Sequence, residues 1–208
     1  MYLYGASGHG RVIKEILESL NQKVDGFIDD NPSVNEQLGL PVQHSAETVD
    51  EVIVTIGDNG MRKRVAEKLR CKFAKGIVHP KAVFSQTASI GEGSVVMAGA
   101  VVNAGTVIGN HSVINTCASV DHECQIGDYV HIAPGAHLCG LIQVGEGTLI
   151  GAGASVIPCV KIGRWCTIGA GAAVVSDVPD GATVVGVPGR IVWRTSVPNR
   201  YKRKPKWG

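Results

Sequence analysis

A histidine and a glutamate stand side by side at His122 and Glu123, within the segment CASVDHECQIG that runs from Cys117 to Gly127. An imidazole beside a carboxylate is suited to general-base chemistry, because the carboxylate fixes the tautomer of the ring and raises its basicity. We therefore predict that His122 accepts a proton during catalysis and that Glu123 is its partner. The alternative is an exposed polar corner with no catalytic role.

The elements that position this pair follow a period of six residues. Aliphatic residues, with one phenylalanine among them, recur at every sixth position from Val78 to Val174, and a small or compact residue follows each by four. Period six fits neither an α-helix nor an ordinary strand. It describes one side of a triangular coil, so three hexads make a coil and residues 18 apart stack. The seventeen hexads predict a left-handed parallel β-helix of between five and six coils.

The stacking period predicts the surroundings of the histidine. Ala104 and Gly140 lie 18 residues before and after His122. Neither carries a large side chain, so we expect the imidazole to stand over a shallow cleft with the Gly140 backbone beside it. Cys124 and Cys166 fall on inward small positions, where we expect them to fill the core rather than act as nucleophiles.

Residues 1–75 lack the period of six. MYLY, VDGFIDD and VDEVIVTIG are typical of strands, and RVIKEILESL and NGMRKRVAEKLR are typical of helices, so this order predicts a small Rossmann-like parallel sheet. The first turn, GASGHG, has the spacing G-x-x-G-x-G, which differs from the dinucleotide-binding spacing. Its backbone N–H groups would suit a phosphate at the start of a helix, although a tight turn without a ligand would use the same glycines.

Two aspartates, Asp29 and Asp30, end the second predicted strand, where such folds bind a ribose or a base. The alternative is a polar start to the loop NPS. The segment TIGDNG ends the third predicted strand at the same edge of the sheet. The GASGHG turn, the two aspartates and TIGDNG would therefore meet at one crevice. Together they favour a nucleotide-binding site more strongly than any one of these segments does alone.

Charge and composition limit the partners. The net charge of +2 argues weakly against nucleic-acid binding, and no apolar run is long enough to insert into a membrane. The chain shows no signal peptide, and its six cysteines include no C-x-x-C pair, so we expect a reduced cytoplasmic protein. The basic segment RYKRKPKWG, at Arg200 to Gly208, is interpreted as a solvated tail.

Three other histidines, His111, His131 and His137, suggest a zinc site, because the γ-class carbonic anhydrases use three histidines on a β-helix. His131 and His137 occupy the same position on consecutive sides of the predicted triangle, so they point in different directions. Three imidazoles could not then meet around one ion at about 2 Å. We expect no metal, and zinc lyase activity stays a minor alternative beside a non-catalytic scaffold.

A resemblance to the sialic acid O-acetyltransferase-like family of sugar acyltransferases rests on six segments: YGASGHGRV, IDD, IGDN, IVHP, NTCASVDHECQIGDYVHIAPGAHLCG and GVPGRIV. It covers residues 1 to about 194, and within the family the chain is most similar to the UDP-4-amino-sugar N-acetyltransferases of bacillosamine synthesis. The resemblance implies a homotrimer that binds acetyl-CoA between adjacent β-helices. It also implies that the N-terminal domain binds a nucleotide sugar.

The resemblance also implies roles for individual residues. His122 would be the general base, Glu123 its partner, and Asn115 a neighbour of the reacting groups. His131 of the adjacent subunit would contact the thioester region. The Gly140 amide would hold the thioester oxygen, and Ala152 and Ala170 would line the pantetheine path. The residues expected to face the nucleotide are Ser7, Gly8, His9, Gly10, Asp29, Asp30 and Asn59.

Together these observations predict an α/β Rossmann-like nucleotide-sugar-binding domain at 1–75, a left-handed parallel β-helix at 76–194 and a basic tail at 195–208. The predicted activity is acetyl-CoA-dependent N-acetylation of the C4 amine of a nucleotide-linked 4-amino-4,6-dideoxy sugar, by direct attack with His122 as base. UDP is the expected nucleotide, and GDP and dTDP stay open. O-acetylation of sialic acid or another sugar hydroxyl is the alternative within the same class.

Overall fold

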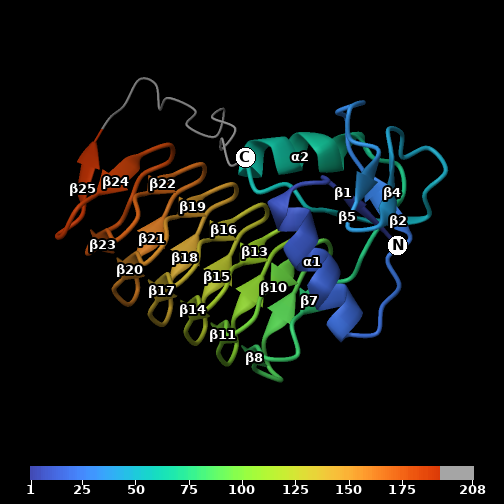
Figure 1. Cartoon of the computed structure of the whole chain (residues 1–208). Helices are drawn as coiled ribbons and strands as arrows, with labels where there is room; N and C mark the ends of the chain where they lie inside the picture. The colour runs from blue at the N-terminus through green and yellow to red at the C-terminus, as the bar shows by residue number, and fades with distance from the viewer. Residues whose placement is uncertain (193–208) are drawn as a thin grey trace.

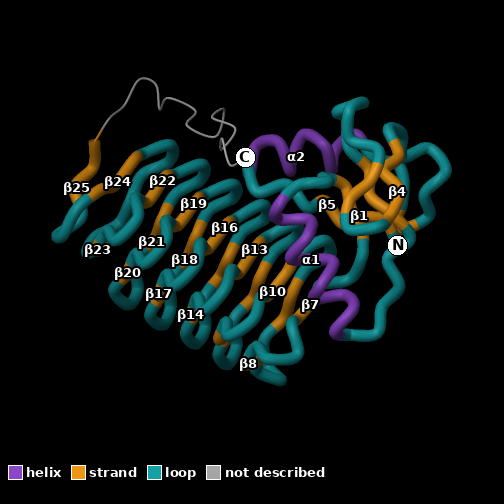
Figure 2. Tube along the Cα trace, viewed as in Figure 1, coloured by secondary structure: helices purple, strands orange, loops and turns teal. Residues whose placement is uncertain are grey.

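The structure is a computed structural model that describes residues 1–192. The tail predicted at 195–208 and the last two residues of the predicted β-helix segment, 193 and 194, lie outside the described residues. An α/β part built from the first strands and both helices lies at one end of a long solenoid (Figure 1). Figure 2 shows that the helices belong to the N-terminal part, while the solenoid consists of short strands separated by turns.

The N-terminal part contains one six-stranded sheet with the order β3-β4-β2-β1-β5-β6. Its strands are β1 (Tyr2–Tyr4), β2 (Gly26–Ile28), β3 (Glu36–Gln37), β4 (Leu40–Gln43), β5 (Glu51–Val54) and β6 (Lys72–Phe73). All neighbours run parallel except β3 and β4, which are antiparallel. The predicted Rossmann-like parallel sheet is thus confirmed, and β3, β4 and β6 extend it beyond the three strands expected.

Helix α1 (Gly8–Ser19) begins three residues earlier than the predicted RVIKEILESL, so Gly8 and Gly10 belong to its first turn rather than to a loop. A Cβ at position 10 would lie 2.3 Å from the carbonyl oxygen of Gly5. Glycine therefore allows the helix to start directly against the end of β1. Helix α2 (Asn59–Lys68) follows β5, and Asp58 caps it by accepting a hydrogen bond from the Met61 N–H.

The solenoid begins at β7 and continues through seventeen two-residue strands to β23. These strands are β7 (Ile77–Val78), β8 (Val83–Phe84), β9 (Ser89–Ile90), β10 (Val95–Val96), β11 (Val101–Val102), β12 (Val107–Ile108), β13 (Val113–Ile114), β14 (Ser119–Val120), β15 (Gln125–Ile126), β16 (His131–Ile132), β17 (His137–Leu138), β18 (Gln143–Val144), β19 (Leu149–Ile150), β20 (Ser155–Val156), β21 (Lys161–Ile162), β22 (Thr167–Ile168) and β23 (Ala173–Val174). Each predicted hexad therefore corresponds to one strand.

Every third strand pairs in parallel, with partners 18 residues apart, as in the pair Val113 and His131. This register produces three faces. Face 1 contains β7, β10, β13, β16, β19 and β22; face 2 contains β8, β11, β14, β17, β20 and β23; face 3 contains β9, β12, β15, β18 and β21. The hairpin of β24 (Thr183–Val185) and β25 (Arg190–Val192) extends face 1. The predicted left-handed parallel β-helix is confirmed.

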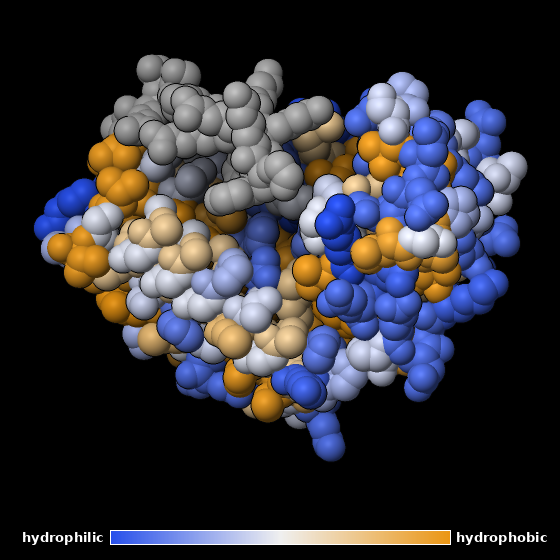
Figure 3. All heavy atoms as spheres, in the orientation of Figure 1, coloured by the Kyte–Doolittle hydropathy of each residue, from blue (hydrophilic) through white to orange (hydrophobic). Residues whose placement is uncertain are grey.

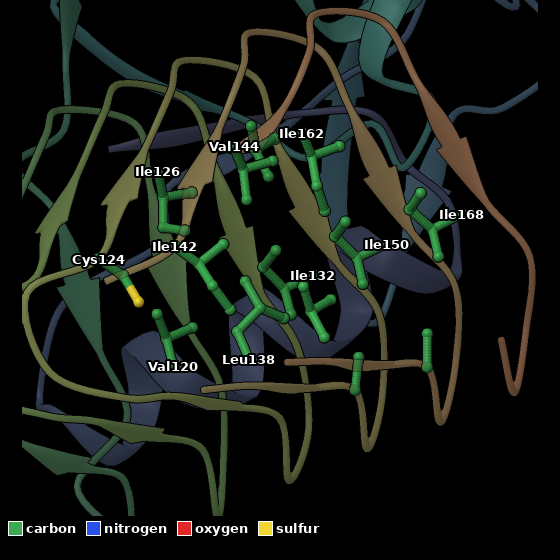
Figure 4. Close-up of a cluster of buried hydrophobic side chains, with 14 of the residues drawn as sticks. Val120, Cys124, Ile126, Ile132, Leu138, Ile142, Val144, Ile150, Ile162 and Ile168 are labelled. Atoms are coloured by element: carbon green, nitrogen blue, oxygen red, sulfur yellow. The ribbon is translucent and has the colours of Figure 1, made fainter. Parts of the chain in front are cut away.

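The interior of the prism is a continuous stack of aliphatic side chains, as Figure 4 shows for Val120, Ile126 and Ile132 among others. Cys124 and Cys166 are buried among them, as predicted. Some of the small residues that point inward are serines or threonines, and their hydroxyl groups form hydrogen bonds between adjacent coils. The Ser112 hydroxyl, for example, donates to the Gly127 carbonyl at 2.8 Å and accepts from the Val130 N–H at 2.9 Å. Each buried hydroxyl thus satisfies backbone groups of the next coil.

Helix α1 connects the two parts by packing across face 1. Ile13 and Ile16 of the helix share one buried cluster with Val95 and Val113 of face 1. Arg62 belongs to α2, and its fully buried guanidinium donates to the carbonyl oxygens of residues 56, 57, 111 and 129. This cation therefore fixes the segment that follows β5 against two coils of the prism.

The surface differs between the two parts. Figure 3 shows hydrophilic side chains over much of the N-terminal part and more apolar ones over the visible coils of the β-helix. Neither α1 nor α2, the helices found within residues 1–192, combines the length and hydropathy that crossing a bilayer requires.

Candidate active site

His122 and Glu123 lie at the edge between faces 2 and 3, in the corner that joins β14 to β15. The Nδ1 atom of His122 lies 3.1 Å from Oε2 of Glu123. When Nδ1 carries the proton, the Nδ1–H donates a hydrogen bond to the carboxylate, and Nε2 is left as a free acceptor. The two side chains are 51% and 65% exposed, so the ring can reach a molecule bound outside the prism.

Hydrogen bonds from the preceding coil hold this corner. The Thr106 hydroxyl donates to the Asp121 carbonyl at 2.6 Å and accepts from the Cys124 N–H at 3.2 Å, so it fixes the backbone on both sides of the His-Glu pair. The Asp121 carboxylate accepts from the His122 N–H at 2.8 Å and from the Asn103 side chain at 2.8 Å. Both hydrogen bonds lower the pKa of Asp121, which keeps it charged.

Gly140 lies directly against the imidazole, as the stacking period predicted. A Cβ at this position would lie 2.5 Å from Nε2 of His122. Within residues 1–192, the Gly140 N–H donates no hydrogen bond to another residue. A free backbone donor therefore accompanies the free acceptor of the ring.

A cavity of about 830 Å³ opens on face 1, between the β-helix and the N-terminal part. Several predicted site residues line it, from both parts of the chain: Ser7, Gly8, His9, Asn59, Asn115 and His131. The segment 57–60, which precedes and begins α2, forms one wall of the cavity. The buried Arg62 donates to Oδ1 of Asn59 at 2.7 Å, so the interdomain cation also positions this wall.

Asn115 and His131 form a pair at the base of this cavity. Nδ2 of Asn115 lies 3.0 Å from Nε2 of His131. Burial, followed by the positive charge of Arg62, lowers the pKa of His131 to about 4. The ring is therefore neutral near pH 7 and can accept or donate a hydrogen bond without bringing a charge into the cavity.

His9 is the second neutral imidazole in the cavity. Burial lowers its pKa to about 3, with further contributions from His131 and Arg62. Its buried Nε2 has no hydrogen-bond partner among the described residues. Ser7 precedes the first turn of α1 and Gly8 begins it, and both are at least partly exposed, so the backbone N–H groups at the start of this helix are open to an anion.

The remaining predicted nucleotide residues lie outside the cavity. Asp29 accepts hydrogen bonds from the Ala6 N–H at 2.9 Å and from the Asn31 N–H at 2.9 Å, so it joins the glycine turn to the loop after β2. Asp30 is exposed and accepts a hydrogen bond from the Tyr4 hydroxyl at 2.5 Å. Gly10 is buried in the helix and serves the packing described above.

Ala152 and Ala170 lie one above the other at the edge between faces 1 and 2, and neither is buried. Their backbones are linked, because the Gly171 N–H donates to the Ala152 carbonyl at 2.9 Å. Within one chain this edge is separate from the edge that carries His122 and Gly140. The structure thus separates the His122 edge from the predicted residues on face 1 and on the edge between faces 1 and 2, while Gly10, Asp29 and Asp30 lie in the N-terminal part outside the cavity.

The histidines of the zinc alternative lie apart. His111 packs between Phe73 and Tyr129, and His137 on face 2 lies 2.8 Å from the Ser119 hydroxyl through Nδ1. His131 is paired with Asn115. Across residues 1–192, no three His, Cys, Asp or Glu side chains are arranged to share one metal ion.

Other residues of the cavity were not predicted from the sequence. Three of them matter most to the shape of the cavity. Arg62 positions the wall formed by the segment 57–60, and Leu149 and Trp165 line the cavity. The signal for Leu149 was present, because its position 18 residues after His131 places it next to that histidine on face 1. No local pattern marks Arg62, since its partners lie 49 and 67 residues away.

Residues 1–69 match the family described as the PglD N-terminal domain, and residues 105–140 and 142–175 match the bacterial transferase hexapeptide family. GDP-perosamine N-acetyltransferase of Escherichia coli O157:H7 is 31% identical over 159 residues, which cover 68% of this chain and 72% of that protein. UDP-N-acetylbacillosamine N-acetyltransferase of Bacillus subtilis (strain 168) is 38% identical over 109 residues, which cover 46% of this chain and 50% of that protein.

Solved structures agree with these matches. The acetyltransferase domain of PglB from Neisseria gonorrhoeae, in complex with acetyl coenzyme A, superposes with a TM-score of 0.84 at 38% identity, covering 92% of this chain and 98% of that one. Perosamine N-acetyltransferase from Caulobacter crescentus, in complex with CoA and GDP-perosamine, gives 0.87 at 36% identity, with coverages of 92% and 96%. The chain therefore belongs to the acetyl-CoA-dependent hexapeptide-repeat N-acetyltransferases that carry a PglD-type N-terminal domain.

Proposed function

We propose that this enzyme acetylates the C4 amine of a nucleotide-linked 4-amino-4,6-dideoxy sugar. The cavity on face 1 offers an anion site at the start of α1, two neutral histidines and the Asn115 amide, which suit a phosphorylated, polar acceptor. The relatives described above are a GDP-perosamine N-acetyltransferase and a UDP-N-acetylbacillosamine N-acetyltransferase. UDP is the nucleotide that we expect here.

We further propose that the active site forms between two subunits of a homotrimer. Within one chain, His122 lies at the edge opposite face 1, whereas the acceptor cavity opens on face 1. Rotational symmetry of a ring makes each contact heterologous, so one surface of a subunit meets a different surface of the next. A trimer can then place the His122 edge of one subunit against the cavity of its neighbour, which supplies Asn115 and His131.

Two features of the β-helix support acetyl-CoA as the acetyl donor: the free backbone N–H of Gly140, and the small side chains of Ala152 and Ala170 along another edge. Acetyl-CoA supplies the acetyl group as an activated thioester. The Gly140 N–H donates no hydrogen bond to any described residue. It is therefore available to donate one to the thioester oxygen as negative charge develops on that oxygen. Such a donor typically contributes about 10²–10³-fold to the rate. The small side chains of Ala152 and Ala170 leave room for a narrow chain along the neighbouring edge.

In the reaction, the neutral sugar amine attacks the thioester carbon, so that a C–N bond forms and the C–S bond breaks. Nε2 of His122 accepts the proton that the amine loses, and this proton leaves with the CoA thiol. The Glu123 carboxylate accepts a hydrogen bond from the Nδ1–H throughout and stabilises the charged ring. General-base assistance of this kind contributes roughly 10²–10⁴-fold.

The observation that carries the proposal is the exposed His122 Nε2 directly beside the Gly140 backbone. The test is a thiol-release assay with acetyl-CoA and UDP-, GDP- or dTDP-linked 4-amino-4,6-dideoxy sugars, with free sialic acid as a hydroxyl acceptor. We expect turnover with a nucleotide-linked amino sugar, and a loss of about 10²-fold or more in kcat for His122→Ala. Turnover of sialic acid alone, or an unimpaired His122→Ala variant, would contradict the proposal.

A further inference from the structure

Exposed aliphatic side chains gather at the end of the β-helix that lies opposite the N-terminal part. Val175 follows the last strand of face 2, and Val185, Val187 and Ile191 belong to the hairpin of β24 and β25. Their exposed fractions range from 40% at Ile191 to 76% at Val187, the highest value among the large exposed hydrophobic residues of 1–192. Figure 1 shows the hairpin at this end, and Figure 3 shows apolar side chains there. We call these four residues the end patch.

The end patch is exposed because the stack of coils stops there. Val184 and Ile191 are direct partners across the hairpin, so their side chains lie on the same face of it. Val184 closes the core of the prism and is 3% exposed, whereas Ile191 lies on the outer strand and is 40% exposed. Among the described residues, no further coil follows to cover it. Repeat proteins usually end in a unit with a polar outer face, so an apolar end indicates contact with another molecule or surface.

Positive charge follows the end patch along the chain. Residues 181–208, which begin with the hairpin, contain seven Lys and Arg residues and no Asp or Glu. The other thirteen Lys and Arg residues and all eighteen Asp and Glu residues lie in 1–180, so that part has a net charge of −5 while the whole chain has +2. The small net charge of the chain therefore conceals an acidic body followed by a basic end.

The composition of this basic segment distinguishes between anionic partners. It includes Trp193, Tyr201 and Trp207, and tryptophan and tyrosine favour the interface between water and a bilayer, because each ring is apolar and carries one polar group. A nucleic acid would use the cations but leave the aliphatic end patch in water. An anionic bilayer accommodates the cations, the aromatic rings and the aliphatic side chains together. Composition alone favours a solvated tail, and the end patch beside it favours this different interpretation.

We propose that the end patch and the basic residues that follow it bind the surface of a membrane that contains anionic phospholipids. The aliphatic side chains enter the boundary between headgroups and acyl chains, and the Lys and Arg side chains pair with the anionic headgroups. The attachment is peripheral, since it uses side chains at one end of the β-helix rather than a spanning segment. This inference goes beyond the proposed function and does not depend on it.

The test is cosedimentation of the full-length protein with vesicles of phosphatidylcholine, with or without about 30% phosphatidylserine, at about 0.15 M salt. We expect binding to the anionic vesicles to be at least about 10-fold tighter. Each Lys or Arg near such a surface contributes roughly fivefold, so Lys202→Glu combined with Lys204→Glu should lower the affinity by more than about 10-fold. Val187→Ser should lower it by about fivefold, because an apolar side chain no longer enters the interface.

Two matched controls change the same chemistry elsewhere. Val83→Ser removes a 62% exposed valine from the first strand of face 2, at the other end of the β-helix. Lys72→Glu combined with Lys75→Glu reverses two exposed cations of the N-terminal part. Both proteins should bind the anionic vesicles as the wild type does, and thermal unfolding checks the fold of every variant.

Several results would overturn the inference. One is equal binding to both kinds of vesicle, or binding to neither. Another is a loss of binding in the controls as large as that in the end-patch and tail variants. Binding of an oligonucleotide but not of vesicles would assign the basic end to nucleic acid instead. Self-association that Val187→Ser abolishes, without vesicle binding, would assign the end patch to a second copy of the chain.

Discussion

Gly140→Ala is the smallest change that tests whether the position of His122 matters. The added Cβ would lie 2.5 Å from Nε2 and 2.6 Å from Cε1 of the imidazole. The φ angle of Gly140 is not in the left-handed region, so alanine fits the backbone. The half-exposed imidazole can turn away from the methyl group, and we expect the fold to be retained.

The size of the effect follows from the geometry. Ordinary van der Waals contact begins near 3.4 Å, so the ring must move by about 0.9 Å (3.4 minus 2.5) to relieve the clash. A misplacement of about 1 Å in a catalytic group typically lowers the rate by about 10²-fold. We therefore expect kcat to fall by about 10²-fold, while the KM for the nucleotide sugar, which we propose binds in the cavity on face 1, stays nearly constant.

The assay is thiol release with acetyl-CoA, measured for wild type, Gly140→Ala, His122→Ala and the double variant. If the methyl group acts only by displacing the imidazole, then it should cost nothing further once the imidazole is absent. Thermal unfolding serves as the control for the fold. A wild-type rate in Gly140→Ala, or an equal loss on the His122→Ala background, would refute the reasoning.

Three other perturbations have defined outcomes. Glu123→Gln should lower kcat by about 10-fold or more with KM unchanged, because a neutral amide stabilises the imidazolium less well; an unchanged kcat would remove Glu123 from its role. Arg62→Met should lower the free energy of unfolding by on the order of 3 kcal/mol, since several buried carbonyls lose their donor, and denaturant titration measures this; a loss below about 1 kcal/mol would contradict the interdomain role. Burial lowers the pKa of His111 to about 4 from 6.5, so the unfolded state binds more protons between these values and stability falls as the pH drops through this window. His111→Phe should reduce the slope of the free energy of unfolding against pH by up to about 1.4 kcal/mol per pH unit. An identical slope in both proteins would show that His111 does not contribute to this pH dependence.

The β-helix was predictable because its energetics repeat. Each hexad must bury one aliphatic side chain and close one corner, so the period appears directly in the sequence. The 18-residue stacking rule was sufficient to predict that Gly140 lies against His122, and the hexad positions were sufficient to predict that Cys124 and Cys166 lie in the core. Local rules sufficed here because each coil contacts only its neighbours.

The cavity on face 1 was only partly predictable. Ser7, His9 and Asn115 were expected near a substrate, but the sequence does not show that one cavity on face 1 contains all three. That arrangement depends on α1 packing across face 1 and on Arg62 reaching carbonyl groups of two coils. The strand pair β3 and β4 was missed for a similar reason, since each of these short strands is defined by its partner rather than by its own pattern.

The proposal that subunits share each active site is tested most directly by complementation. A His122→Ala protein and a His131→Ala protein, each expected to be inactive, are dissociated, mixed in equal amounts and reassembled, and mixed trimers are verified by mass. If each site combines His122 of one subunit with His131 of the next, random mixing leaves about one quarter of the sites intact. We predict recovery of about one quarter of the wild-type activity. Verified mixed trimers that remain inactive would contradict the shared site.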